Sequence, residues 1–512
     1  MPDVVIVGAG IAGLAAAYEL SRQGVGCVVL ERHARPGGVI FSEEVDGFTI
    51  DGGPDSLLVQ KPAGIQLCQE LGLGARLVPT KLPRLAYILR AGTLHALPAA
   101  SVLGIPTRVK PFLGSQLFSW PGKLRMGAEL FVPRRPDAAG DESIGAFITR
   151  RFGREAATYI AEPLLAGIHA GDVDRLSVRA LFPQFVEAER THGSLLRAFR
   201  ARQSAIRPSR ASGRPDPSTS SGSSRATSRD EPVEGRNPHS EIRIADGVFR
   251  SLPGGLSELV RTLVQSLPPG TVQTGAAVTR VSDRSASDSS PDAVASSPRF
   301  LVERASGTPV EARAVILAAP AFVTSTLTHD YDAELSRLCG EIPYASSAAI
   351  VLAFDRQAVR HPLNGSGFVV PRVEGSTLLA VSWLSSKWPG RAPDNRVLLR
   401  AFVGGARDPH ALERSDEELV REALTALTPL LGIGAPPLLS RVYRWERANA
   451  QHEVGHLERM AAIESRLARH AGLYVTGSGF RGTGIPDCIA DGRATARTAS
   501  EKVKSEKLKD KS

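Results

Sequence analysis

Residues 4–31 read VVIVGAGIAGLAAAYELSRQGVGCVVLE, in the order apolar strand, glycine-rich turn, amphipathic helix and second strand. Gly8 permits a tight turn, Gly10 lets the backbone approach a pyrophosphate, and Gly13 lets the helix pack closely on the strand. Phosphate is attracted to a helix N-terminus, and Glu31 can accept a hydrogen bond from a ribose hydroxyl. A GxGxxG pattern alone also occurs in structural turns, but its place between two strands predicts a dinucleotide-binding domain.

The sequence after Glu31 indicates which dinucleotide is bound. Residues 31–58 read ERHARPGGVIFSEEVDGFTIDGGPDSLL, with a glycine pair at Gly37-Gly38 and a second one at Gly52-Gly53. This extension is unusual for nicotinamide domains and resembles the flavin amine oxidase superfamily. The resemblance implies that the first pair lies beside the FAD phosphates and that Gly53 to Ser56 lie near the flavin. The alternative is two ordinary glycine turns.

Length and composition predict a large globular protein. The chain has 512 residues and 42% hydrophobic content, enough for several domains with buried cores. Four cysteines without CxxC or metal-ligand spacing argue against a disulfide framework or a metal site and fit a reducing compartment. The phosphate-binding strand begins at Val4, which leaves no room for a targeting segment, and no apolar run reaches the ~18 residues of a membrane span.

The net charge of +9 is concentrated in two polar stretches. Residues 197–243 contain ten arginines against five acids, and residues 501–512 contain five lysines against three acids. The first includes RPSRASGRPDPSTSSGSSRATSRDEPVEGRNP, a composition that cannot build a core and predicts a disordered insertion. A solvated insertion is favoured over a basic arm for an anionic surface, so no nucleic acid partner is expected.

Strands far apart in the chain predict one discontinuous domain. Apolar strands are expected at 272–281, 300–303 and 314–318, and LYVTGSGF recurs at 473–480. The C-terminal GLYVTGSGFRGTGIPDCIADGRATARTA (472–499) repeats the order of strand, glycine-rich turn and helix. A helix beginning near Ile485 to Asp487 would point its positive end at the ligand in that turn, and Asp487 would alternatively cap the helix.

These patterns predict an α/β protein: a discontinuous Rossmann-like FAD-binding domain, an α+β substrate domain and an inserted helical domain. The FAD domain is expected to comprise residues 1–85, 246–320 with a polar loop at 283–298, and 441–500. A substrate-channel, helical and membrane-contact domain is expected at 86–200, and the substrate domain at 321–440. The insertion is expected at 201–245 and a charged tail at 501–512.

Four further motifs make the resemblance narrower. They are YILRAGTLHALP (87–98), EPLLAGIHAGDVDRLSVRALFPQF (162–185), VFRSLPGGLSELV (248–260) and GTGIPDCIADGRATA (482–496). Together and in order they resemble the oxygen-dependent protoporphyrinogen and coproporphyrinogen oxidases over almost the whole chain. The resemblance implies oxidation of a porphyrinogen in heme biosynthesis: six electrons leave as three hydride transfers to FAD, and oxygen is converted to hydrogen peroxide. No catalytic side chain is implied, because the flavin accepts the hydride.

The resemblance also implies substrate contacts. By family position, Leu164 and the Gly167 carbonyl would contact the tetrapyrrole, with Phe368 and Leu379 as apolar walls; each is alternatively an ordinary core residue. Substrate propionates require a cation. Many relatives place an arginine at the position of Ala86, so the anchor here is open, with Arg84 the first candidate and Arg90 and Arg108 weaker ones.

The implied FAD contacts are more extensive. They comprise Gly8, Ala9, Gly10, Ile11, Ala12, Gly13, Glu31, Arg32, Gly37, Gly38, Val39, Gly53, Pro54, Asp55, Ser56, Val278, Gly477, Ile485, Pro486 and Asp487.

Several alternatives stay open. The chain could be another flavin amine oxidase or a carotenoid-desaturase-like oxidoreductase, or a non-catalytic binding protein of the GDP-dissociation-inhibitor type. LGIPTRVKPFLGSQLFSWPGK (103–123) resembles the Gram-positive type of porphyrinogen oxidase, which favours coproporphyrinogen as an accepted substrate. The expected location is the cytoplasm. A peripheral membrane contact, a homodimer and handover of product to ferrochelatase are left open.

Overall fold

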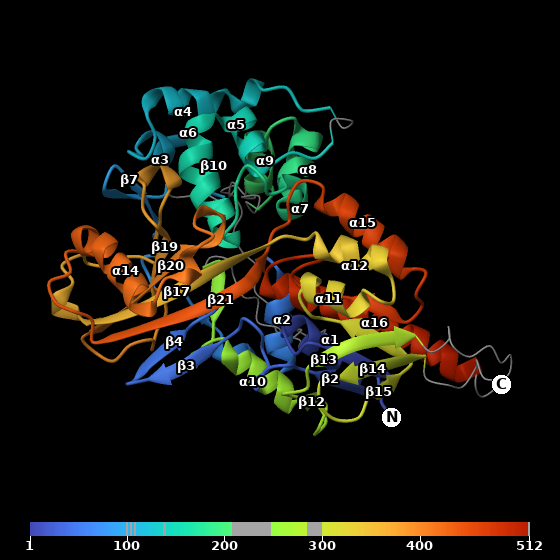
Figure 1. The fold of residues 1–512 in the computed structure, drawn as a ribbon. Helices are drawn as coiled ribbons and strands as arrows, with labels where there is room; N and C mark the ends of the chain where they lie inside the picture. The colour runs from blue at the N-terminus through green and yellow to red at the C-terminus, as the bar shows by residue number, and fades with distance from the viewer. Residues whose placement is uncertain are drawn as a thin grey trace, which may run out of the picture.

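A computed structural model describes residues 1–98, 101–102, 105–106, 109–136, 140–206, 247–283 and 299–509. Figure 1 shows a helical layer at the top, a sheet of long strands in the middle, and a second α/β unit below it that holds the N-terminus. Most of the insertion predicted at 201–245 lies outside the described residues, as does the loop predicted at 283–298 apart from Asp283. Residues 201–206 are helical and complete α9 (Leu195–Ile206).

The lower unit is built on a parallel five-stranded sheet in the order β12-β2-β1-β16-β22. The strands are β1 (Val4–Val7), β2 (Cys27–Leu30), β12 (Val272–Gln273), β16 (Ala314–Leu317) and β22 (Leu473–Val475). Start, middle and end of the chain therefore meet in one sheet, as the strand pattern predicts.

Both faces of this sheet are buried. Val4 and Ile6 pack in one core with side chains of α1 (Ile11–Arg22), α2 (Pro62–Glu70), α10 (Ser257–Gln265) and α16 (Ile485–Lys509). Val5 and Val7 pack in another core with α11 (Ala321–Thr328), α12 (Ala333–Gly340) and α15 (His456–Leu467). Burial on both faces explains why β1 is apolar at every position instead of alternating.

The prediction of one strand at 272–281 is wrong in one respect. It is two strands, β12 and β13 (Val278–Asp283), separated by a turn in which Gly275 has φ +67°. β12 extends the parallel sheet, whereas β13 forms an antiparallel sheet with β14 (Phe300–Arg304) and β15 (Val310–Ala312). A positive φ favours glycine and ends the extended run.

The middle layer is a seven-stranded sheet in the order β21-β17-β20-β19-β18-β7-β8. Its strands are β7 (Tyr87–Arg90), β8 (Thr93–Ala96), β17 (Tyr344–Asp355), β18 (Gly367–Val369), β19 (Leu378–Trp383), β20 (Arg396–Gly404) and β21 (Leu439–Ala450). This sheet includes residues 87–96, which are predicted for the segment 86–200, and β21, which crosses the boundary predicted at 440/441. One face packs on α14 (Asp416–Leu431), and the other packs on the hairpin of β3 (Ser42–Val45) and β4 (Phe48–Asp51).

The upper layer is helical (Figure 1). Its helices are α3 (Val109–Leu113), α4 (Trp120–Gly127), α5 (Ile144–Phe152), α6 (Arg154–Ala156), α7 (Val178–Leu181), α8 (Pro183–His192) and α9, with a π-helix, η4 (Ala157–Ala166), and 3₁₀ turns η2 (Ala128–Phe131) and η5 (Gly167–His169). They share a core around Phe147, Ile148 and Phe185. This layer presents η4 and η5 toward the rest of the molecule.

The C-terminal segment of the chain continues helix α16. The charged tail predicted from residue 501 is helical to Lys509, and Lys507 pairs with Asp3 at 2.7 Å. α16 packs in the core of the lower unit as far as Val503, whereas Leu508 is 70% exposed. Among the described residues, no helix combines the length and apolarity needed to cross a bilayer.

Candidate active site

The first glycine turn forms a tight cradle between β1 and α1. Gly8 has φ +104°, and a Cβ on Gly13 would lie 2.0 Å from the Gly8 carbonyl oxygen. Buried Glu31 accepts hydrogen bonds from Ala9 N–H (2.8 Å, Oε2) and His33 N–H (2.9 Å, Oε1). The turn brings backbone amides to the start of α1 and places a carboxylate at the tip of β2, an arrangement that fits the phosphates and ribose of a dinucleotide.

The Gly37-Gly38 pair lies against the Gly8 turn. Gly37 and Gly38 have φ +106° and +60°, and Gly37 N–H donates to the Ala9 carbonyl at 2.7 Å. Arg35 fixes this turn by donating to the carbonyls of Gly38 (2.9 Å) and Ile40 (3.2 Å). The Gly8 turn and the Gly37-Gly38 pair, both predicted from the sequence to border one cofactor, are thus adjacent in space.

The Asp51 to Asp55 segment is held by side chains from the middle sheet. A Cβ on Gly53 would lie 1.9 Å from the Val39 carbonyl oxygen, so this segment passes directly over the second glycine turn. Arg400 of β20 donates to the carbonyls of Asp51 and Gly53, both at 2.6 Å. The backbone predicted to lie near the flavin is therefore positioned by a residue some 350 positions later in the chain.

Asp55 is the centre of a buried charge cluster. Its carboxylate accepts hydrogen bonds from Lys387 Nζ (2.9 Å) and Trp388 Nε1 (3.2 Å), and Arg400 Nη2 lies 3.2 Å away. Burial alone would raise the pKa of Asp55, but the charges of Lys387 and Arg400 outweigh burial and hold that pKa well below its usual range. Asp55 is therefore an ionised anchor that joins the lower unit to the middle sheet.

A second carboxylate, Asp51, has the opposite balance. It accepts from Ser42 Oγ (2.6 Å) and pairs with buried Arg391 (2.9 Å). Burial raises the pKa of Asp51 despite Arg391, and the nearby charge of Asp55 raises it further. The two acids of one short segment thus differ in their environments.

The C-terminal glycine turn lies between β22 and α16. Asp491 of α16 accepts from Thr476 Oγ1 (2.6 Å) and Gly477 N–H (3.1 Å), which fixes the start of the turn. Asp487 in the first turn of the helix pairs with Lys61 at 2.5 Å and accepts from Gly484 N–H at 3.3 Å. Asp487 caps the helix, as the alternative interpretation holds, and α16 begins at Ile485, as predicted.

The other predicted FAD contacts are distributed around these turns. Arg32 is exposed and donates to the ring of its neighbour His33 (2.9 Å), Val39 is 42% exposed, and Val278 is half-buried in β13. Ser56 donates to the Asp55 carboxylate at 3.0 Å. The roles of these residues, and of Ile11, Ala12, Pro54 and Pro486, stay predictions.

The predicted tetrapyrrole contacts lie at the end of the π-helix. Half-buried Leu164 packs against the helical core, and Gly167 begins η5. Glu162 of the same segment pairs with Arg407 (2.7 Å), which also donates to the carbonyls of Val370 (2.7 Å) and Leu378 (2.8 Å). This ion pair fixes the π-helix on the middle sheet.

The two predicted apolar walls have different environments. Phe368 is 2% exposed and packs with Trp383 in the core between the sheet and α14, which matches its alternative as a core residue. Leu379 is the extra residue of a β-bulge between Leu378 and Ala380. Bulges redirect side chains, but Leu379 is buried as well, and the substrate roles of both residues stay predictions.

The predicted propionate anchors are not brought together. Exposed Arg84 donates to the Thr80 carbonyl at 3.2 Å and lies against Gly247. Arg90 pairs with Glu155 (2.9 Å) and stacks on the Tyr159 ring. Arg108 lies outside the described residues. None of the three is shown to be a substrate anchor.

Sequence reasoning missed the side chains that hold these turns. Lys387, Arg400 and Lys61 lie outside every quoted motif. Asp491 and His169 lie within quoted motifs, but neither is assigned a role there. Only the polarity of Arg400 within an otherwise apolar strand, RVLLRAFVG, signalled a buried partner.

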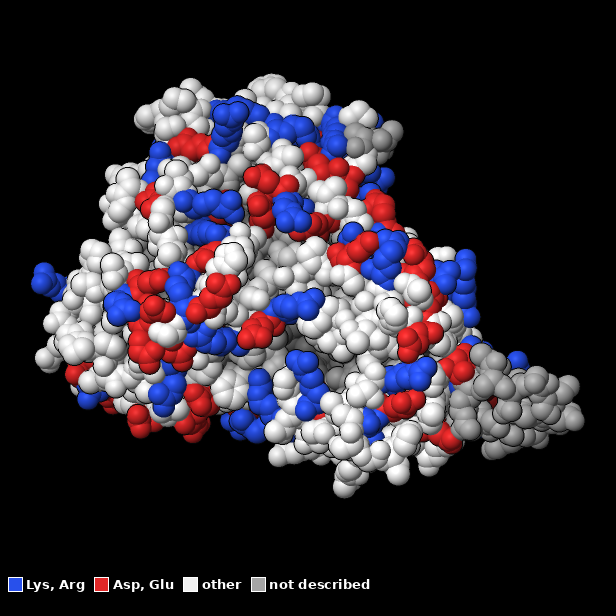
Figure 2. Space-filling model, viewed as in Figure 1, with Lys and Arg blue, Asp and Glu red and all other residues white. Residues whose placement is uncertain are grey.

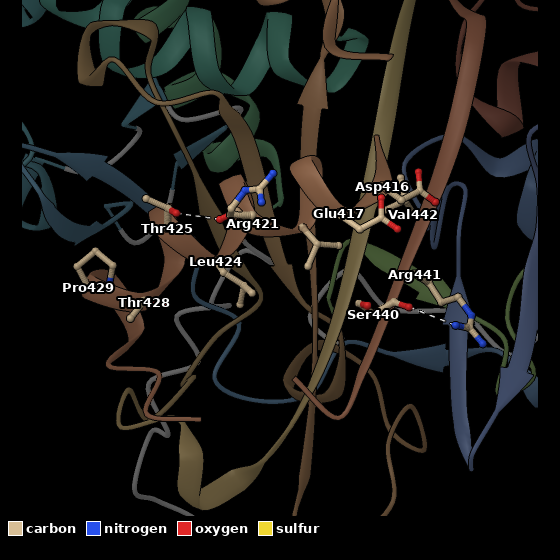
Figure 3. Close-up of a pocket in the computed structure, with 11 residues that line it drawn as sticks. Asp416, Glu417, Arg421, Leu424, Thr425, Thr428, Pro429, Ser440, Arg441 and Val442 are labelled. Carbon is tan, nitrogen blue, oxygen red and sulfur yellow. Dashed lines mark hydrogen bonds between the residues drawn. The ribbon is translucent and has the colours of Figure 1, made fainter. Parts of the chain in front are cut away.

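One groove among the described residues lies away from these turns. It measures about 750 Å³, runs between α14 and β21, and is lined by Val420, Leu424 and Val442 with Arg421 and Arg441 (Figure 3). It contains none of the predicted site residues. The site is therefore identified by its turns and not by this groove.

The discontinuous parallel sheet, its two N-terminal glycine turns and its C-terminal turn define an FAD-dependent oxidoreductase. Residues 11–500 match the family described as flavin containing amine oxidoreductase. The chain belongs to this family and groups with its porphyrinogen oxidases.

Named relatives agree along the full length. The chain is 33% identical to coproporphyrinogen III oxidase of Bacillus subtilis (strain 168) over 503 residues, covering 97% of each chain. It is 26% identical to the chloroplastic protoporphyrinogen oxidase of Nicotiana tabacum over 508 residues, covering 95% of this chain and 83% of that protein. A crystal structure from Exiguobacterium sp. 255-15, provisionally named protoporphyrinogen oxidase, has a TM-score of 0.78 at 29% identity and covers 97% of this chain and 98% of its own.

More distant structures share the fold alone. A reduced UDP-galactopyranose mutase has a TM-score of 0.66 at 16% identity over 99% of this chain and 98% of its own. One scaffold therefore carries different chemistries, and its substrate must be inferred from the site.

Proposed function

We propose that the protein oxidises a porphyrinogen, with coproporphyrinogen III as the favoured substrate and molecular oxygen as the final acceptor. The observation that carries the proposal is the end-to-end similarity to coproporphyrinogen III oxidases at 33% identity, together with the intact cradle. Protoporphyrinogen IX is the second candidate, because plant protoporphyrinogen oxidases match at 26–28% identity.

The residues of the chain bind and orient in this proposal. When bound, FAD supplies the acceptor for a hydride, which carries two electrons. Glu31 and the glycine turns hold its nucleotide half, while Gly53 to Ser56 and the turn at 477–487 border its other half. The segment with Leu164 and Gly167 holds the macrocycle, and the Glu162–Arg407 pair keeps that segment on the sheet. Positioning of this kind contributes a large share of a rate enhancement without an acid–base dyad.

The substrate experiment offers both porphyrinogens to FAD-loaded protein under air and follows porphyrin fluorescence. We expect coproporphyrin to form faster than protoporphyrin, with hydrogen peroxide released. A Gly13→Val variant, in which the added side chain fills the cradle, is the control for non-enzymatic oxidation. If neither porphyrin forms faster than with this variant, the proposal is wrong.

A peripheral membrane contact is the second part of the proposal. Trp120 and Leu124, one turn apart on α4, are 64% and 73% exposed, and Phe131 of η2 is 84% exposed. Exposed tryptophan and leucine on one helix face favour the interfacial zone of a bilayer. The two basic residues of the same helix make internal hydrogen bonds: Lys123 donates to the Leu113 carbonyl and Arg125 to the Arg150 carbonyl. The contact we propose is therefore apolar.

Vesicle co-sedimentation tests this contact. Trp120→Ala and Leu124→Ala together should reduce binding to phosphatidylglycerol vesicles, whereas Val373→Ala, a change at a 63% exposed residue of the middle layer, should not. Equal binding by all variants would remove the membrane contact from the proposal.

The charge distribution bears on partners. Figure 2 shows Lys and Arg interspersed with Asp and Glu over the face in view, and no large field of one sign dominates it.

A homodimer and handover of product to ferrochelatase remain parts of the proposal. Light scattering after gel filtration tests the dimer, and a pull-down with purified ferrochelatase tests the handover.

A further inference from the structure

Two parts of the site are connected by six consecutive residues, Gln451-His452-Glu453-Val454-Gly455-His456, of which the first five lie between β21 and α15 and the last begins α15. In Figure 1 this connection lies where the helical layer meets the lower unit. We call it the QHEVGH segment. No glycine motif of the fold includes it.

One side of the QHEVGH segment holds the residues that follow the π-helix. Gln451 Nε2 donates to the His169 carbonyl at 2.9 Å, two residues after Gly167. The backbone continues the contact, since Ser177 N–H donates to the His452 carbonyl and Val454 N–H to the Arg175 carbonyl, both at 2.9 Å. The substrate-side segment is thus attached to QHEVGH by both side chain and main chain.

The other side holds the C-terminal glycine turn. His452 Nε2 lies 2.9 Å from the Ser478 carbonyl oxygen, and His456 Nε2 lies 2.8 Å from that of Phe480. A carbonyl only accepts, so each imidazole donates its Nε2–H. The turn predicted to border the flavin is therefore held through its own backbone.

The two imidazoles are neutral and tightly packed. Their rings stack at 3.8 Å and 10°, and the two side chains are 2% and 1% exposed. Burial and, to a smaller extent, the adjacent His456 lower the pKa of His452 to about 3. Burial also lowers the pKa of His456. Neutral rings can stack this closely, whereas two imidazolium ions would repel.

A direct hydrogen bond closes the arrangement. His169 Nδ1 lies 3.3 Å from Thr483 Oγ1, so the substrate-side segment contacts the turn itself. Gly171 allows the close packing, because a Cβ there would lie 2.4 Å from Gln451 Oε1. The substrate-side segment, the QHEVGH segment and the C-terminal glycine turn therefore each contact the other two.

We infer that Gln451, His452 and His456 are positioning residues that set the substrate-side segment at a fixed distance and orientation from the flavin-side turn. The inference rests on the proposed function, which puts the macrocycle at Leu164 and Gly167. Reaction rates depend steeply on such placement, since displacements near 1 Å can cost about 100-fold. Gln451 acts on the substrate side and the histidines act on the cofactor side.

The experiment separates the two sides with three variants of the full-length protein. Gln451→Leu removes the donor to the His169 carbonyl at similar volume, His452→Leu removes the donor to the Ser478 carbonyl, and His452→Gln restores a donor. His410→Leu is the control, because His410 is exposed and pairs only with Glu413 at 2.7 Å. FAD affinity is measured by fluorescence titration, kcat and KM with coproporphyrinogen III, and Tm by calorimetry.

We expect different responses from the two sides. Gln451→Leu should lower kcat about tenfold with FAD Kd changed less than about twofold, because it removes the substrate-side contact and a local hydrogen bond to the Asn449 carbonyl but no contact to the flavin-side turn. His452→Leu should raise FAD Kd about tenfold, and His452→Gln should recover most of that loss. His410→Leu should behave as the wild type does.

Three outcomes would overturn the inference: unchanged kcat and FAD Kd in both Leu variants, equal effects of both on FAD Kd, or losses that follow the decrease in Tm alone. If His452→Leu does not fold, Gln451→Leu and His452→Gln decide the question through kcat and FAD Kd. Failure of the proposed function gives a different result, since wild-type protein would then oxidise neither porphyrinogen while the FAD Kd measurements still report on His452.

Discussion

The two ends of the cofactor site are built in different ways. The nucleotide end is local: β1, the Gly8 turn, α1, β2 and the Gly37-Gly38 turn lie within 40 consecutive residues and depend on backbone conformation. The end predicted to border the flavin is assembled from side chains that lie 14 to 347 positions away: Arg400 holds Gly53, Asp491 holds Gly477, and His452 holds Ser478. Local backbone geometry is readable from sequence, whereas contacts between distant side chains depend on the fold.

The largest expected effect is at the nucleotide end. Gly13→Ala would place a Cβ about 2.0 Å from the Gly8 carbonyl oxygen, a backbone atom that cannot move away without opening the turn. We expect FAD affinity to fall at least about 100-fold, because the helix can no longer pack close to the strand and its N-terminus moves from the phosphates. Fluorescence titration of apoprotein with FAD measures this.

Gly127→Ala is the matched control for this change. Gly127 ends α4, has no positive φ, and a Cβ there would meet nothing within 4 Å. It should leave FAD affinity unchanged. Equal affinities for the two variants would show that the first turn does not carry the phosphates.

The next effect is at the flavin end. Asp55→Leu leaves buried Lys387 and Arg400 without their carboxylate, and removing one member of a buried ion pair typically costs about 3–5 kcal/mol. Asp416→Leu breaks the partly exposed pair with Arg444, and an exposed pair contributes less than about 1 kcal/mol. Urea denaturation of both variants gives the comparison, and similar losses would mean that the Asp55 cluster is no more than a surface ion pair.

A smaller effect concerns pH. The pKa of His452 is lowered by burial to about 3 and that of His169 to about 4, so the unfolded chain binds protons that the folded chain does not between these values and about 6.5. The free energy of unfolding should therefore decrease as pH falls below about 6.5, by about 1.4 kcal/mol per pH unit for each histidine.

Urea denaturation from pH 7 to pH 5 measures this dependence, and His452→Gln should reduce its slope by one histidine's share. The exposed His410 provides the control, since the pKa of His410 is raised by its hydrogen bond to Glu413. An unchanged slope in His452→Gln would show that His452 is not the buried neutral group.

The same contrast explains how far sequence reasoning reached. The glycine turns, the strand at 314–317 and the start of α16 are predictable because a positive φ, a buried apolar run and a helix cap leave local marks. The substrate walls are not: Phe368 is apolar whether it faces a macrocycle or α14, and its direction is set by pairing with Tyr87 and Val381. Likewise, nothing in the sequence around Arg84 indicates which group its guanidinium contacts.

The smallest effect is expected far from both ends of the cofactor. Ser415 and Glu418 form a capping box at the start of α14, with Glu418 N–H donating to Ser415 Oγ at 3.2 Å and Ser415 N–H to Glu418 Oε2 at 2.7 Å. Ser415→Ala should cost about 1 kcal/mol of stability, because one amide of the first turn loses its acceptor. FAD Kd and kcat should not change, because α14 packs on the face of the sheet opposite the β3–β4 hairpin. A loss of activity at unchanged FAD affinity would show that this outer face communicates with the substrate side, and the division of the site into a local and an assembled end would then need a third region.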